Sequence, residues 1–157
     1  MSTATRRCFL IRTAGFGAGV GILSALPLRA IHATPQAMQE AIRKIAGEAA
    51  LQHGKVVLDV PPLVENGNTV PLTVSVESPM TEADHVKAIH IVNEKNPQPQ
   101  VISVTLGPRA GRASLSTRIK LADSQQVVAV AEMSDGWFWS ESADIIVTIA
   151  ACVEGIL

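Results

Sequence analysis

Apolar and polar residues alternate along most of the chain after position 55, in short runs separated by turn-forming residues. The clearest run is 113–121, where Ala113, Leu115, Thr117, Ile119 and Leu121 share one face and Ser, Arg and Lys occupy the other. Further runs occur at 56–60, 70–76, 86–92, 101–106, 127–133, 137–139 and 145–149. A two-residue period is that of a strand with one buried face. The pattern therefore predicts an antiparallel, immunoglobulin-like β-sandwich over residues 56–149.

Turn signals separate these runs. Glu65-Asn66-Gly67-Asn68 is expected to form a turn, Asn96-Pro97-Gln98-Pro99 closes the third run, and Asp135-Gly136 is expected to form a hairpin turn. Short strands at close intervals with such turns between them are typical of sandwiches and barrels.

A different period precedes the strands. Thr34 is a suitable N-cap for a helix that begins at Pro35, and Gly54 is a suitable residue to end it. Between them one apolar stripe recurs at spacings of three and four residues, at Met38, Ile42, Ile45 and Ala49. We therefore expect one N-terminal helix over residues 35–53.

The first thirty-three residues have the features of an export signal. Arg6 and Arg7 precede an apolar, glycine-containing stretch over 13–28, and Ala30 and Ala33 offer cleavage points. The stretch is short for a bilayer-spanning helix, which needs about 20 residues. Paired arginines before a weakly apolar segment indicate a twin-arginine signal over 1–33, although an N-terminal membrane anchor is the alternative. We expect a folded, periplasmic domain over 34–157 with no membrane anchor after cleavage.

Charge and composition exclude several classes of partner. The whole chain carries 14 acidic and 13 basic residues, and four of the basic ones lie in the expected signal. No basic run or stripe remains in the mature chain, so binding to nucleic acid or to an anionic membrane surface is not expected. Aromatic residues make up only 3% of the chain, so its core is expected to be aliphatic.

The residues that usually carry catalysis are scarce. His53, His85 and His90 do not have the spacing of metal ligands, and no nucleophile elbow, phosphate loop or dinucleotide fingerprint is present. We therefore expect no metal, no cofactor and no independent enzymatic activity.

One thiol remains as candidate chemistry. Cys8 lies in the expected signal, so Cys152 would be the only cysteine of the exported protein. In an oxidising compartment an unpaired cysteine is either an intermolecular link or a reactive group. Because it stands near the chain end, we expect a mobile tail over 150–157 that presents the thiol to other proteins. A carrier protein is the predicted function, with an intermolecular disulfide in a structural or redox-responsive module as the alternative.

A series of segments resembles the Y subunit of the Sox thiosulfate-oxidising system. These segments, taken in order, are Val64-Glu65-Asn66-Gly67, Val70-Pro71, His85-Val86-Lys87-Ala88-Ile89, Asn96-Pro97-Gln98-Pro99, Ser116-Thr117-Arg118-Ile119, Val127-Val128-Ala129-Val130-Ala131, Ser134-Asp135-Gly136 and Val147-Thr148-Ile149 with Cys152 nearby. The resemblance implies a periplasmic sulfur carrier with an immunoglobulin-like fold and with Cys152 as the covalent attachment point. It also implies a heterodimer with a Z-type subunit.

The same resemblance implies the enzymes that the carrier serves. These are a c-type cytochrome that conjugates thiosulfate to the thiol, a hydrolase that releases the terminal sulfone as sulfate, and a sulfane dehydrogenase. The tail departs from the Gly-Gly-Cys-Gly-Gly that is usual in the family, because Ala150, Ala151, Val153, Glu154 and Gly155 surround the cysteine here. Glycine has no Cβ and gives a thinner, more flexible tail. A carrier for a different sulfur compound is therefore a second alternative.

Overall fold

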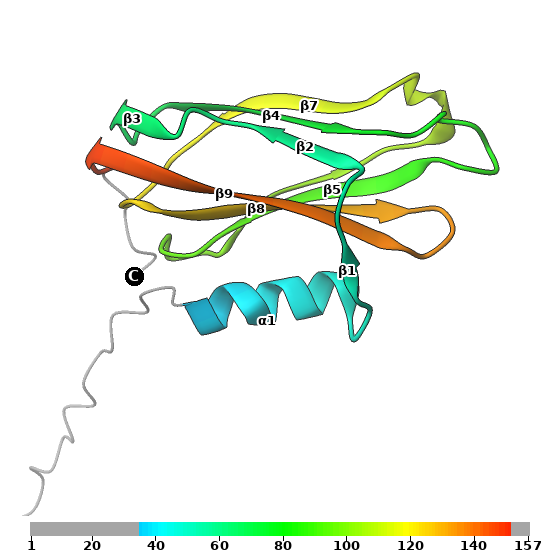
Figure 1. Cartoon of the computed structure of the whole chain (residues 1–157), viewed down its shortest axis with the longest axis horizontal. Helices are drawn as coiled ribbons and strands as arrows, with labels where there is room; N and C mark the ends of the chain where they lie inside the picture. The colour runs from blue at the N-terminus through cyan, green and yellow to red at the C-terminus, as the bar shows by residue number, and fades with distance from the viewer. Residues whose placement is uncertain (1–34, 152–157) are drawn as a thin grey trace, which may run out of the picture.

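Two β-sheets face each other across an aliphatic core, and one helix covers the outer face of the larger sheet (Figure 1). The computed structural model describes residues 35–151. Its elements, in chain order, are α1 (Pro35–Ala46), β1 (Leu51–Gln52), β2 (Val56–Asp59), β3 (Leu63–Asn66), β4 (Val70–Val76), β5 (Val86–Asn93), β6 (Gln100–Thr105), the short 3-10 helix η1 (Pro108–Ala110), β7 (Ala113–Ile119), β8 (Gln125–Met133) and β9 (Phe138–Ile149). The prediction of a mainly β, immunoglobulin-like sandwich with one N-terminal helix is confirmed.

The larger sheet has the strand order β1-β9-β8-β5-β6, with β3 also paired to β9, and the smaller sheet has the order β2-β4-β7. Most pairs are antiparallel, but β1 and β3 run parallel to β9, which differs from the expected all-antiparallel arrangement. A parallel pair requires a crossover connection instead of a hairpin. Here the connection is most of the sandwich itself, since residues 53–137 join β1 to β9 and residues 67–137 join β3 to β9.

The core between the sheets is built from aliphatic side chains, as the composition predicts. Its largest fully buried members include Ile89, Ile91, Leu121, Met133 and Ile145. Trp139 is partly buried at the margin of this cluster, and the Nζ of Lys55 lies 5.0 Å from the centre of its ring.

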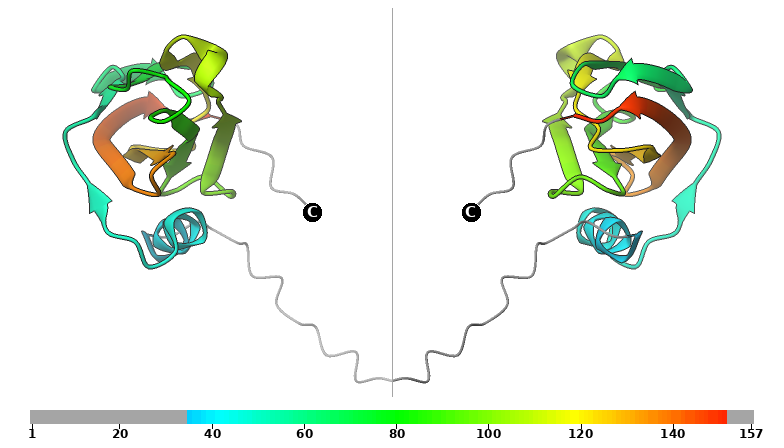
Figure 2. Two further views of the ribbon diagram at one scale, coloured as in Figure 1. Left: turned by 90° about the vertical axis from the view of Figure 1, so that its right-hand side faces the viewer. Right: turned by 90° about the vertical axis from the view of Figure 1, so that its left-hand side faces the viewer.

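Helix α1 forms a third layer, which Figure 2 shows end-on beside the sandwich. Its buried residues Met38, Ala41 and Ile42 pack on Val92 of β5 and on Val128 and Val130 of β8. No helix among the described residues is long and apolar enough to cross a membrane.

The helix is shorter than the predicted 35–53, because Gly47 ends it instead of Gly54. Gly47 has a φ of 63°, a left-handed conformation that glycine adopts without steric cost. Its N–H donates to the carbonyl of Arg43 at 2.8 Å, which closes the last turn. The chain then turns back along the sheet edge as β1, and Gly54 lies in the connection to β2.

Strand β9 is longer than predicted. Residues 138–139 of the first run and the whole run 145–149 belong to one strand of 12 residues, and the stretch between them pairs with β8 throughout. Backbone pairing holds this stretch although its side chains do not alternate in polarity. The predicted hairpin turn at Asp135-Gly136 is confirmed, since Gly136 has a φ of 87° and the N–H of Trp137 donates to Oδ1 of Asp135 at 3.0 Å.

The predicted turn at residues 65–68 is displaced by the strand that precedes it. Glu65 and Asn66 belong to β3, and the turn itself begins at Gly67. This turn brings Gly67 against the last residues of β9.

Candidate functional site at the end of strand β9

The last residues of β9 are held on both sides of the strand. On one side, the Oγ of Ser124 accepts the N–H of Val147 at 2.9 Å and lies 3.4 Å from its carbonyl. On the other side, the Oγ1 of Thr148 donates to the carbonyl of Glu65 in β3 at 3.1 Å. The end of β9 is therefore held by hydrogen bonds to neighbouring segments on both sides.

Beyond this point three backbone hydrogen bonds join three segments that are distant in sequence. The N–H of Gly67 donates to the carbonyl of Ile149 at 2.8 Å, and the N–H of Leu121 donates to the carbonyl of Gly67 at 2.8 Å. The N–H of Ala151 donates to the carbonyl of Leu121 at 2.9 Å. We call this set of four residues, Gly67, Leu121, Ile149 and Ala151, the tail clamp.

Close packing accompanies these bonds. Gly67, Leu121 and Ala151 are all buried. A Cβ on Gly67 would lie 2.5 Å from the carbonyl oxygen of Leu121, 2.9 Å from the nitrogen of Ala151 and 3.0 Å from Cγ1 of Val147. Only glycine fits between these groups without displacing one of them, and the reason is lack of space and not backbone conformation.

The clamp changes one sequence-based expectation. We expected a mobile tail that begins at Ala150, but Ala151 is only 7% exposed and its N–H is hydrogen-bonded. The physical reason is that the chain continues along the end of the sandwich for two residues after β9. Ala150 is exposed. The other predicted site and signal residues, Cys152, Val153, Glu154, Gly155, Arg6 and Arg7, lie outside the described residues.

The histidines singled out from the sequence do not come together. The Nδ1 of His53 lies 3.0 Å from the carbonyl of Ser140, and that of His85 lies 3.1 Å from the carbonyl of Thr81. His90 pairs its Nδ1 with the Oγ of Ser103 at 2.8 Å. Within residues 35–151 no group of three or more His, Cys, Asp or Glu side chains could hold a metal ion.

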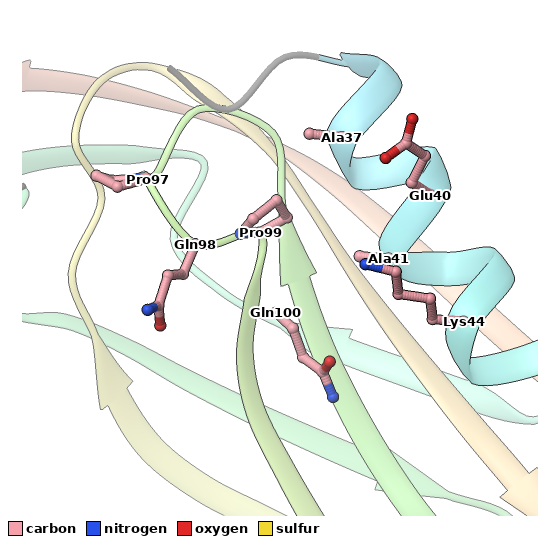
Figure 3. A pocket seen from close by; sticks show the side chains of 8 residues that line it. All are labelled: Ala37, Glu40, Ala41, Lys44, Pro97, Gln98, Pro99 and Gln100. Carbon is pink, nitrogen blue, oxygen red and sulfur yellow. The ribbon is translucent and has the colours of Figure 1, made fainter. Parts of the chain in front are cut away.

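A pocket of about 400 Å³ lies between α1 and the loop that joins β5 to β6 (Figure 3). The helix contributes Ala37, Glu40, Ala41 and Lys44 to its walls, and the other side is formed by residues 97–99 of the loop and by Gln100 at the start of β6. Glu40 and Lys44 are its charged residues, one helical turn apart and both exposed. The lining of the pocket contains no cysteine, no histidine and no pair of carboxylates.

Sequence reasoning singled out Cys152, which lies outside the described residues, but not the clamp that precedes it. The clamp joins residues 67, 121 and 151, whose separation in the chain leaves no local pattern. The Asn66-Gly67 turn was recognised, but its contact with the tail depends on the parallel pairing of β3 with β9. Asn93 was also missed, because its position in the apolar run of β5 gives no sign that its amide is fully buried.

Comparisons with known proteins give a consistent result. The family model of the sulfur oxidation protein SoxY matches residues 42–152, a range that includes Cys152. The structure of the sulfur carrier protein SoxY from Chlorobium limicola f thiosulfatophilum is 26% identical, with a TM-score of 0.61 over 73% of this chain and 98% of that one. No curated protein matches the chain.

Other solved structures share the architecture. The superoxide reductase (neelaredoxin) from Ignicoccus hospitalis is 20% identical, with a TM-score of 0.54 over 74% of this chain and 95% of that one. The putative superoxide reductase from Thermotoga maritima is also 20% identical, with a TM-score of 0.50 over 62% of this chain and 87% of that one. At this level of identity the likeness shows the fold alone. The match to the family model, in contrast, covers most of the sequence, and the chain therefore belongs to the SoxY family of sulfur oxidation proteins.

Proposed function

We propose that this protein is a periplasmic sulfur carrier that holds sulfur intermediates covalently on Cys152 and presents them to partner enzymes. The observation that carries the proposal is that the family match extends to Cys152, directly after the residue that the tail clamp holds. The solved SoxY of Chlorobium limicola is itself described as a sulfur carrier. A carrier needs a stable scaffold and one accessible nucleophile, and the catalytic groups belong to its partners.

The proposed cycle begins with oxidative conjugation. The Cys152 thiolate and thiosulfate form an S–S bond and give up two electrons, which a c-type cytochrome accepts. A hydrolase then uses water to cleave the bond between the sulfane sulfur and the sulfone, which releases sulfate and two protons and leaves a persulfide on the cysteine. A sulfane dehydrogenase processes the sulfur that remains. In this cycle the protein is a covalent handle and not the catalyst.

A heterodimer with a Z-type subunit and export by the twin-arginine route complete the proposal. Arg6 and Arg7 would direct folded protein across the membrane, and the Z-type subunit would cross bound to it. The alternative function is that of a carrier for another sulfur compound, since the tail sequence differs from the one that is usual in the family.

The mass of intact protein purified from sulfur-fed cells tests this function. We expect adducts of about +32 Da for a persulfide and about +112 Da for bound thiosulfate, both removable by reductant. Cys152→Ser should remove every adduct and leave the midpoint of thermal unfolding unchanged, because the described core does not include this residue. Cys8→Ser serves as the control and should still carry adducts. A stable disulfide-linked dimer without sulfur adducts would support the structural alternative instead.

A further inference from the structure

We propose that Gly67 is a positioning residue for the carrier thiol, because the tail clamp that it completes holds Ala151, the residue that directly precedes Cys152. This inference rests on the proposed function of Cys152. Its consequence is that the thiol is delivered at the rim formed by the β3–β4 turn and the β7–β8 connection, and not on an arm that begins inside β9.

The covalent geometry of the chain sets the reach. Consecutive Cα atoms are about 3.8 Å apart. While Ala151 is held, the distance between the thiol and the rim is therefore at most the length of one residue plus one cysteine side chain. If the Gly67 and Leu121 bonds opened, residues 150 and 151 would also be released. Each extended residue adds at most about 3.3–3.6 Å, so the thiol would gain roughly 7 Å of reach. The closed clamp therefore suits a shallow active site in the partner enzyme, and the open clamp suits a deep one.

Gly67 allows the clamp to close because it has no side chain. Its missing side chain allows its N–H to bind Ile149 and its carbonyl to bind Leu121, and it leaves the nitrogen of Ala151 room to bind Leu121 in turn. A methyl group 2.5 Å from the backbone oxygen of Leu121 cannot be accommodated by rotating a side chain. Either Leu121 in the β7–β8 connection or Ala151 after β9 must then move. Ala151 is the easier of the two to displace, because it lies beyond the end of β9 and, among the described residues, a single backbone hydrogen bond to Leu121 holds it.

Gly67→Ala tests the inference, and Gly107→Ala is the matched control. Gly107 also lies in a connection between strands and has a φ of −126°, but a Cβ there would meet no atom within 4 Å. Two probes measure the access of the thiol in the mature full-length protein. Tetrathionate is the small probe, since it reacts with a thiol to give the thiosulfate adduct, free thiosulfate and a proton. A maleimide carried on a small folded protein is the large probe.

Opening the clamp should help the large probe more than the small one. With a loss of one to two net hydrogen bonds, we expect Gly67→Ala to raise the rate ratio of large to small probe about tenfold, and amide exchange at Ala151 by a similar factor. Gly107→Ala should change neither quantity. An unchanged rate ratio in Gly67→Ala, with faster exchange at Ala151, would overturn the inference, because the clamp would then open without affecting the thiol.

A second variant covers the case in which Gly67→Ala fails to fold or accommodates its methyl group. Ala151→Pro removes the N–H that Leu121 accepts and leaves the turn at Gly67 intact. It should raise the rate ratio as well, and no change there would overturn the inference. Neither probe depends on sulfur metabolism. Absence of sulfur adducts in cells would therefore refute the proposed function and leave the result on the clamp standing.

Discussion

At the scale of single residues, Asn93 is the polar group that the fold satisfies least. Its side chain is 0% exposed, and neither amide atom has a hydrogen-bond partner among the described residues. It pairs with Val127, a member of the core between the sheets, whereas the preceding Val92 faces the helix. The amide therefore points into an apolar interior, where an unsatisfied group costs about 1–3 kcal/mol.

Replacing this amide should stabilise the protein. We expect Asn93→Val to raise the free energy of unfolding by about 1 kcal/mol in urea titrations, because it removes the buried, unpaired group and keeps a strand-forming side chain. Asn96→Val is the matched control. Asn96 bonds to Lys120, Ala122 and Gln125, so its loss should cost about 1–3 kcal/mol. Equal losses for both variants would show that Asn93 has a partner such as an ordered water.

His90 gives the stability of the protein a dependence on pH. Partial burial lowers the pKa of His90, and the nearby Glu132 carboxylate offsets part of that effect. The folded chain therefore binds a proton less readily than the unfolded chain. Stability rises with pH between the lowered pKa and the ordinary value of about 6.5, and it is lost as the pH falls through this range.

His90→Gln should flatten this dependence. We expect the free energy of unfolding of the unchanged protein to fall between about pH 7 and pH 5, as the histidine is protonated more completely in the unfolded chain. The variant should lose less over the same interval, which urea titrations at both pH values would measure. An identical fall in both proteins would assign the pH dependence to other groups.

At the scale of elements, the sequence predicted strands best where one face alone is apolar. The bounds predicted for β4 are those observed, and the seven residues of β7 are correctly placed within the predicted run. The middle of β9 was missed because pairing with β8, and not side-chain polarity, holds its polar residues in the sheet. The helix was predicted too long because Gly47 was treated as an interior residue instead of its end.

The sequence also indicates one part of the candidate site and not the other. The role of Cys152 stays a prediction, and it rests on the expected compartment and on the number of cysteines in the sequence. The tail clamp could not be predicted, because its bonds depend on which strands become neighbours. Gly67 meets Ile149 only because β3 pairs with β9, and meets Leu121 only where the β7–β8 connection closes the same end of the sandwich.

Docking of α1 should account for a measurable share of stability. Ile42 is 8% exposed and packs in the cluster beneath the helix, so Ile42→Ala should cost about 2–5 kcal/mol. Gln39→Ala, on the exposed face of the same helix, should stay within about 0.5 kcal/mol of the unchanged protein. Urea titrations would measure both. A small effect of Ile42→Ala would mean that the helix is held mainly by Met38 and Ala41.

At the scale of the whole molecule, the proposed twin-arginine export would link folding to export. The core depends on pairings between distant segments, since β9 contacts strands from both ends of the chain. Such a fold is complete only when the last strand is in place, and we propose that the chain crosses the membrane in this folded state by the twin-arginine route. On this proposal, the Z-type partner would reach the periplasm only when it is bound to this chain before export.

Replacing Arg6 and Arg7 by lysine tests this linkage in cells that produce both chains. We expect both proteins to stay in the cytoplasm as a one-to-one complex, measured by fractionation and immunodetection of each chain. The unchanged pair should appear together in the periplasm. Changing Arg12 to lysine is a suitable control, because it alters a single arginine outside the expected pair and should leave export intact. If the partner reached the periplasm while this chain stayed behind, the two would cross separately, and their association would have to follow export.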